Sequence, residues 1–163
     1  MEKSLLVNDV SYESDIIRLT IGYDSYETAT ISEILSVLAE NGINIDLIVQ
    51  TINHHVKPTM SFTIAKEQFA KSLRILESSK QLLGFCFADF EVGLAKVSIF
   101  GTGVAFNSGV AAKMFARLGR EGIHVKMIST SEVKVSVVVN QEDMVRAANV
   151  LHDEFQIPQQ LIG

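Results

Sequence analysis

The sequence is short of several residue types, and each shortage excludes a class of protein. It has one cysteine in 163 residues, so an intrachain disulfide cannot form and a reducing compartment is favoured. No apolar run approaches the roughly 18 residues of a membrane span, and the first residues lack the basic and apolar regions of a secretory signal. We therefore expect a cytoplasmic protein without a membrane partner.

Positive charge is also scarce. Fourteen Lys and Arg stand against 19 Asp and Glu, which gives a net charge of −5, and the basic residues are not clustered. Because nucleic-acid binding relies on clustered Lys and Arg, we expect no nucleic-acid partner. With 47% hydrophobic residues, 20% charged residues and only two prolines, the composition is typical of a compact globular protein.

One segment of the chain occurs twice. Residues 34–52 (ILSVLAENGINIDLIVQTI) correspond to residues 114–132 (MFARLGREGIHVKMISTSE), so that Gly42 aligns with Gly122. Each copy has the pattern of an amphipathic helix, a glycine stop and an alternating apolar strand. This repetition favours two small domains of about 80 residues each, near the lower size for a single core.

The order of elements is the same in both copies and predicts a ferredoxin-like βαββαβ fold. In the first copy we expect strand 16–23, a helix capped by Thr30 and Glu33 and ended by Gly42, strand 43–50, a turn at 54–58, strand 60–64, a helix over 69–76 and strand 85–92. In the second copy we expect strand 96–100, helix 110–120, strands 123–130 and 133–139, and helix 142–155.

The second copy lacks a last strand, because its final residues, QIPQQLIG, show no alternation. The chain has an unassigned apolar segment at residues 5–10 and then a polar break at residues 11–15. An unpaired sheet edge promotes aggregation, so we predict that residues 5–10 complete the second sheet. The fold class is therefore α+β, with a first domain at residues 14–91 inserted into a second domain at residues 3–13 and 92–163.

No pattern in the sequence supports catalysis or metal binding. Gly101 and Gly103 lack the third glycine of a dinucleotide loop and the Lys-Ser/Thr of a triphosphate loop, so they predict a simple turn. His54 and His55 are adjacent on a turn, with no cysteine or paired carboxylates nearby in the sequence. We expect no catalytic residue, no metal and no cofactor in this chain.

The polar groups around the first helix suit a free amino acid instead. A helix N-terminus favours a carboxylate. On the following strand, Asn44, Asp46 and Gln50 share one face, where Asp46 can accept from an ammonium group and Gln50 can both donate and accept. The alternative is that this polar face is merely solvated.

Three segments resemble the tandem ACT domains of the regulatory half of aspartate kinase: residues 41–50 (NGINIDLIVQ), 61–69 (SFTIAKEQF) and 109–139, of which MISTSEVKVSVVV is the most specific part. The resemblance implies a non-catalytic regulator of an enzyme that phosphorylates aspartate with ATP, with lysine or threonine as feedback effector. The partners that it implies are the aspartate kinase catalytic domain or subunit and a second copy of the chain, as a homodimer through the ACT domains.

By position, the resemblance implies an effector site at an ACT–ACT interface. Its residues would be Tyr26, Thr28, Ala29, Thr30 and Ile31 from the first loop and helix, Asn44, Asp46 and Gln50 from the strand, and His124 and Val125 of the second copy on the opposing side. The loop departs from the family, because Thr28-Ala29 replaces a Pro-Gly turn. In the second copy Lys126 aligns with Asp46, and a lysine would repel a cationic effector, so we place a lysine-type site in the first copy.

Two other functions stay open. A purely structural ACT subunit with a degenerate loop would dimerise without regard to added amino acids. A free-standing ACT sensor would regulate some other protein. The residues do not decide between a separate small subunit and the regulatory part of a longer chain.

Overall fold

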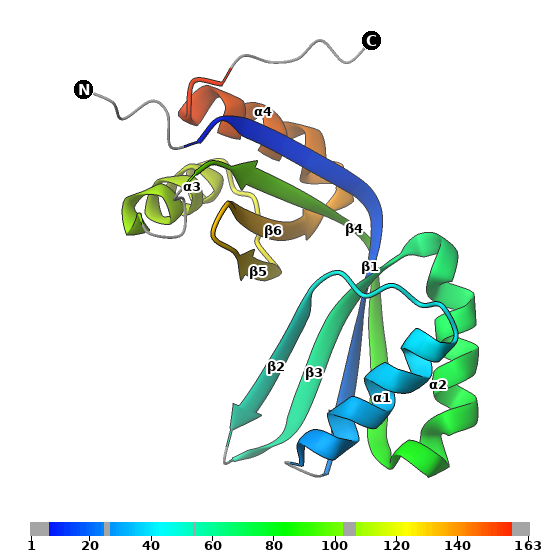
Figure 1. Ribbon diagram of the computed structural model, residues 1–163. Helices are drawn as coiled ribbons and strands as arrows, with labels where there is room; N and C mark the ends of the chain where they lie inside the picture. Colours follow the sequence, from blue (N-terminus) through cyan, green and yellow to red (C-terminus); the bar gives the residue numbers. More distant parts are fainter. Residues whose placement is uncertain (1–6, 25–26, 54, 103–106, 158–163) are drawn as a thin grey trace. The chain divides into compact units, whose positions relative to one another are not determined.

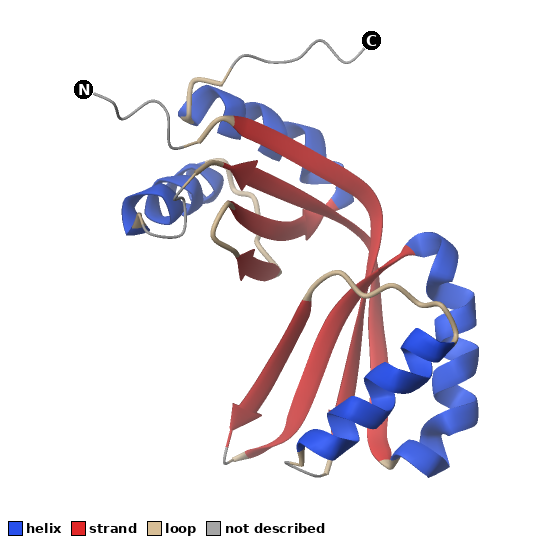
Figure 2. Cartoon of the chain, viewed as in Figure 1, coloured by secondary structure: helices blue, strands red, loops and turns tan. Residues whose placement is uncertain are grey.

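A computed structural model describes residues 7–24, 27–53, 55–102 and 107–157 of the chain. Its elements, in chain order, are β1 (Asp9–Tyr23), α1 (Thr28–Glu40), β2 (Ile48–Asn53), β3 (Val56–Ala65), η1 (Lys66–Gln68), α2 (Phe69–Leu83), β4 (Phe85–Phe100), α3 (Ser108–Arg120), β5 (Met127–Thr130), β6 (Lys134–Asn140), η3 (Gln141–Asp143) and α4 (Met144–Glu154) (Figures 1 and 2). None of the helices in these ranges is long and apolar enough to cross a membrane.

The chain divides into two compact units. One, here called the inserted unit, comprises residues 15–92, and the other, the outer unit, comprises residues 1–14 and 93–163. Strands β1 and β4 each contribute residues to both units. Next to the boundary each of these strands has one residue with positive φ, Asp15 at 57° and Gly93 at 71°.

The inserted unit is a ferredoxin-like α+β fold. Its strands are ordered β2-β3-β1-β4, and the β1–β3 and β2–β3 pairs are antiparallel. Helices α1 and α2 lie on one face of this sheet (Figure 1). Alternate β1 residues Ile17, Leu19, Ile21 and Tyr23 join the core that includes Ile34 and Leu38 of α1, which confirms a strand over residues 16–23 with one buried face.

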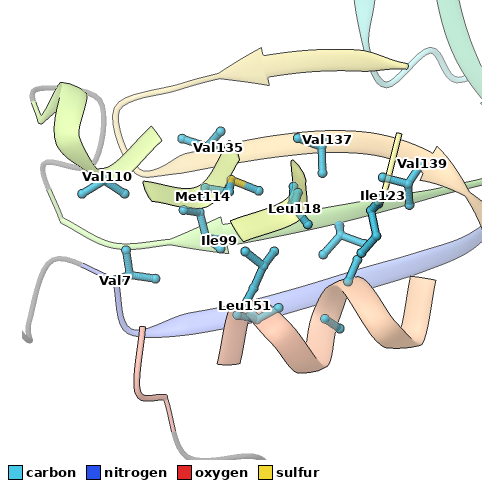
Figure 3. Packing of buried hydrophobic residues seen from close by; sticks show 14 residues of the cluster. Val7, Ile99, Val110, Met114, Leu118, Ile123, Val135, Val137, Val139 and Leu151 are labelled. Atoms are coloured by element: carbon cyan, nitrogen blue, oxygen red, sulfur yellow. The ribbon is translucent and has the colours of Figure 1, made fainter. Parts of the chain in front are cut away.

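The outer unit repeats this architecture with strands ordered β1-β4-β6-β5. Helices α3 and α4 cover its core, where Val110, Met114 and Leu118 of α3 and Leu151 of α4 pack on Ile99, Val135, Val137 and Val139 (Figure 3). The missing strand is supplied by the start of β1, and Asn8 N donates to Phe100 O at 2.8 Å. The segment near the N-terminus therefore completes this sheet, as predicted. Among the described residues the strand begins at Asp9, and the predicted start at Leu5 lies outside them.

The predicted polar break at residues 11–15 was wrong. Residues 11–14 are exposed but belong to β1, which runs unbroken from Asp9 to Tyr23. In the outer unit β1 is an edge strand, where polar side chains are tolerated and even protective. The two strands predicted at 85–92 and 96–100 likewise form the single strand β4.

Several predicted boundaries also moved. Residues 43–47 are not a strand, and β2 begins at Ile48. Pro58 lies in β3 rather than in a turn, close to a register shift between Thr51 and Asn53 of β2 that interrupts the regular ladder. In the outer unit, β5 likewise begins only at Met127.

The ends of α1 were predicted with mixed success. Gly42 has φ +73° directly after the C-cap residue Asn41, which confirms the predicted glycine stop. The Thr30–Glu33 capping box does not form, because α1 already begins at Thr28 and its N-cap residue is Glu27. In β4, Phe85 is buried, whereas Phe87 and Phe90 are 44% and 48% exposed.

Candidate functional site

The predicted site residues of the inserted unit lie at its two opposite ends. Residues 28–31 form the first turn of α1, whereas Asn44 and Asp46 follow the other end of this helix. At about 1.5 Å per residue, the 13 residues of α1 separate these groups by about 20 Å. Tyr26 lies outside the described residues. The structure therefore does not bring Asp46 to the N-terminus of α1 within one inserted unit.

The first turn of α1 is largely open to solvent. Thr28 and Ala29 are exposed, while Ile31 packs against the core. The N-cap residue Glu27 makes no side-chain cap hydrogen bond. In α3, by contrast, the Asn107 side chain accepts from Gly109 N at 3.0 Å. The two units thus differ in how the first turn of their first helix is capped.

A salt bridge lies where β1 ends and the antiparallel strand β3 begins. Lys57 Nζ is 2.6 Å from Asp24 Oδ1, and both side chains are more than 60% exposed. Because solvent screens such a pair, it contributes little to stability. It places one positive and one negative group beside the chain that leads into α1.

The segment that carries Asn44 and Asp46 is held by Gln68, which sequence reasoning did not identify. Gln68 Nε2 donates to Gly42 O at 2.9 Å, and Asn44 N donates to Gln68 Oε1 at 3.0 Å. Asp46 N donates to Thr63 O at 3.1 Å. The side chains of Asn44 and Asp46 are exposed. The backbone here is thus fixed although it is not a regular strand.

Gln50 lies on the opposite sheet face from the one predicted. In the ladder Gln50 is opposite Met60, which is opposite the core residue Ile21, and residues directly opposite share a face. Gln50 therefore lies on the face that the helices cover. The period-2 pattern was interpreted in the wrong phase, because residues 43–47 do not pair as a regular strand.

On that face Gln50 Nε2 donates to the Tyr23 hydroxyl at 2.8 Å. The Tyr23 side chain is fully buried. Burial raises the pKa of Tyr23, while the hydrogen bond from Gln50 acts in the opposite direction. Tyr23 was not predicted as a site residue, although the alternation from Ile17 to Ile21 points to its burial.

The outer unit carries equivalent positions with different chemistry. Lys126 N donates to Val138 O at 2.7 Å, as Asp46 N does to Thr63 O, so the alignment of Lys126 with Asp46 holds in three dimensions. His124 is exposed, and Val125 is partly buried against the outer core. A carboxylate in one unit is thus replaced by an ammonium group in the other.

The described residues contain no group of three or more His, Cys, Asp or Glu side chains arranged to hold a metal ion. A shallow groove of about 360 Å³ lies between α1 and α2 of the inserted unit. It is lined by Ser32, Glu33, Ser36, Val37, Leu82 and Leu83. No predicted site residue lines this groove.

Known proteins resemble this chain over most of its length. A family model described as an ACT domain matches residues 97–155. Aspartokinase 2 of Bacillus subtilis is 43% identical over 157 residues, which cover 96% of this chain and 38% of that protein. The chain spans the same 38% of aspartokinases from another Bacillus strain and from Geobacillus stearothermophilus.

Two solved structures match both in fold and in extent. The ligand-free regulatory subunit of aspartate kinase from Thermus thermophilus is 31% identical with a TM-score of 0.84, over 92% of this chain and 99% of that one. A chain in a crystal structure of aspartokinase alpha and beta subunits is 32% identical with a TM-score of 0.84, over 93% of this chain and 99% of that one.

Proposed function

This chain belongs to the aspartate kinase family as an ACT-domain regulatory part, and from that premise we propose that it binds lysine or threonine and transmits the occupancy to a catalytic part. Catalysis belongs to that partner, because the residues of this chain suggest no reacting group. The near-complete coverage of a separate regulatory subunit supports a regulatory role for a chain of this extent.

The observation that carries the proposal is the separation of the candidate residues along the inserted unit. Gln50 and the first turn of α1 lie toward one end, and Asp46 lies toward the other. A free amino acid is too short to bridge the roughly 20 Å length of α1. An effector bound at the α1 end therefore needs its opposing wall from a second chain.

The edges of the two sheets offer such a wall. Strand β2 ends the inserted sheet and β5 ends the outer sheet. The β2 sequence IVQTIN carries no charge, and Ile48 and Ile52 are 51% and 53% exposed. An uncharged apolar edge strand is a template for pairing with another chain.

Antiparallel pairing of two edge strands places the start of one beside the end of the other. If β2 of a second chain pairs with β2, its Asn44 and Asp46 approach the first turn of α1. If β5 of a second chain pairs with β2, its His124 and Val125 approach the same turn. Our proposal takes the first arrangement, because it brings the carboxylate of Asp46, rather than the ammonium group of Lys126, toward a cationic ligand, and the variants below distinguish the two.

The charges of the inserted unit suit a zwitterionic amino acid. The N-terminus of α1 favours the carboxylate, and the Gln50 side chain can accept from or donate to the polar groups of the ligand. Asp46 favours a cationic ligand, whereas Lys126 at the equivalent place opposes one. We therefore assign the sensing role to the inserted unit and an architectural role to the outer unit.

Regulation then follows from linkage. An effector changes the activity of the catalytic part only if it binds one arrangement of the assembly better than another. A ligand held between two chains meets this condition, because separating or shifting the edge strands removes part of its site.

Calorimetric titration with L-lysine and with L-threonine tests this function. We expect saturable binding of at least one of them, and we expect Asp46→Ala to weaken lysine binding by about tenfold or more through loss of a charge-assisted hydrogen bond. Lys126→Ala, the equivalent change in the outer unit, is the matched control and should not weaken it. Absence of binding of either amino acid to the folded dimer would contradict the effector assignment.

His124→Ala identifies the opposing wall. With β5 of a second chain as the wall, this substitution should weaken binding, because His124 would lie beside the ligand. We expect an unchanged affinity in His124→Ala together with a loss in Asp46→Ala, which would assign the wall to β2. A loss in His124→Ala with an unchanged affinity in Asp46→Ala would assign it to β5. The assay requires that each variant keep the thermal melting profile of the parent chain.

A further inference from the structure

We propose that Tyr23 is a positioning residue, which fixes the carboxamide of Gln50 so that its oxygen faces the amino-acid effector. This inference rests on the proposed function and adds to it a residue that acts through Gln50 without touching the ligand. Its basis is one hydrogen bond, the burial of one partner and the comparison of the two units.

Tyr23 has the properties of a fixed anchor. It is the last residue of β1, its side chain is fully buried, and it belongs to the core formed with Ile34 and Leu38 of α1. A buried tyrosine normally directs its hydroxyl to a polar partner, and here that partner is Gln50. The ring position is thus set by packing, and the hydroxyl position follows from it.

Gln50 has the opposite character. It lies on the edge strand β2 and is exposed, so in isolation its side chain would sample several rotamers. The 2.8 Å bond from Nε2 to the Tyr23 hydroxyl selects one of them. Because a carboxamide is planar, holding its nitrogen also directs its oxygen, which then offers a preformed acceptor for an ammonium or hydroxyl donor.

The outer unit lacks this pair. The Ile21–Met60 and Ile99–Val135 pairs occupy equivalent positions in the two sheets, so Tyr23 corresponds to Gly101. Gln50 pairs with Met60, and Thr130 pairs with Val135. Because Met60 and Val135 are equivalent, Gln50 corresponds to Thr130. A glycine and a threonine cannot make the bond. The preformed acceptor is therefore confined to the unit that we assign as the sensor.

The test is a double-mutant cycle measured by calorimetric titration of the 163-residue chain with L-lysine and L-threonine. The variants are Tyr23→Phe, Gln50→Ala and the double variant. Tyr23→Phe keeps the buried ring and removes only the hydroxyl. The matched control is Tyr12→Phe, which removes the hydroxyl of a tyrosine that is 40% exposed in the outer unit.

We expect Tyr23→Phe to weaken binding about five- to tenfold, the worth of one oriented hydrogen bond, with no change in Tyr12→Phe. The double variant should bind no more weakly than Gln50→Ala alone, because Tyr23 acts through Gln50. A merely structural role would lower the melting temperature and leave this coupling at zero.

Three results would overturn the inference. If the parent chain binds an effector and Tyr23→Phe binds it equally well, the inference fails while the proposed function stands. If losses in Tyr23→Phe and Gln50→Ala simply add, Tyr23 does not act through Gln50. If the parent binds neither amino acid, the inference and the proposed function fail together.

Discussion

Two hydroxyl pairs occupy equivalent places in the two sheets and differ in burial. In the outer unit Ser98 Oγ and Ser136 Oγ are 2.7 Å apart and almost wholly buried. In the inserted unit Thr20 Oγ1 and Ser61 Oγ are 2.8 Å apart and only partly buried. The repeat thus provides an internal comparison of the same hydrogen bond with and without access to water.

Ser136→Ala should lower the free energy of unfolding by about 1–3 kcal/mol, because it leaves the buried Ser98 hydroxyl without its partner. Ser61→Ala should lower the free energy of unfolding by less, since the partly buried Thr20 hydroxyl can form a hydrogen bond with water instead. Urea denaturation measures both, and Ser98→Ala/Ser136→Ala should recover part of the loss. Equal losses in the two units would contradict this explanation.

Tyr23 also gives stability a dependence on alkaline pH. The pKa of Tyr23 in the folded chain lies above the ordinary value of about 10, and burial of the side chain is the main cause of this rise. The folded state therefore favours the protonated phenol, so this stabilisation is fully present below pH 10 and is lost as pH rises through the folded pKa.

Tyr23→Phe removes this dependence. Between about pH 9 and pH 11 the free energy of unfolding of the parent should fall more steeply than that of the variant. Urea denaturation over this range checks the difference, and Tyr12→Phe should retain the parental slope. Parallel curves for the parent and Tyr23→Phe would show that the Tyr23 phenol titrates normally.

The sequence predicted the place of a single residue well only where the repeat gives that residue an equivalent in the other unit. The equivalence of Asp46 and Lys126 follows from the repeat, and both make the same backbone bond. The Tyr23–Gln50 and Gln68–Gly42 bonds could not be predicted, because they depend on the register of β2 and on the path of the irregular segment before it.

At the scale of elements, the four α-helices of the described residues were all predicted, but the strands were divided wrongly. A polar run at residues 11–15 is the usual pattern of a loop, yet on an edge strand it continues the ladder. Within β1, Asp15 has a positive φ of 57°, a backbone conformation that no composition pattern indicates. In β2, five irregular residues changed the expected phase of the alternation and with it the face of Gln50.

The edge strands make a prediction of their own. Ile52→Lys adds a charge to the uncharged strand β2, where Ile52 is 53% exposed, and should prevent edge pairing without unfolding the inserted unit. Leu82→Lys on α2 is the matched control, since Leu82 is 81% exposed and lies away from the edge. Sedimentation velocity should show a monomer for Ile52→Lys and a dimer for Leu82→Lys.

Ile128→Lys applies the same charge to β5, where Ile128 is 50% exposed. Loss of the dimer in this variant as well would indicate β2–β5 pairing, and its retention would indicate β2–β2 pairing. A dimer that persists in both Ile52→Lys and Ile128→Lys would exclude pairing through either edge.

At the scale of the whole molecule, one supersecondary unit has been used twice and its copies have diverged in charge. The fold and the family follow from the repeat and from a resemblance that extends over most of the chain. The location of the effector does not follow from the sequence alone, because the candidate residues lie at opposite ends of the inserted unit.

Sedimentation equilibrium of the chain with and without L-lysine or L-threonine tests this account most directly. A ligand bound between two chains must tighten their association, because binding and dimerisation are thermodynamically linked. We predict that saturating effector lowers the dimer dissociation constant by at least several-fold and that Asp46→Ala or His124→Ala, whichever supplies the opposing wall, reduces this shift. A dissociation constant that neither amino acid changes would contradict an effector site at the interface and would favour a purely structural subunit.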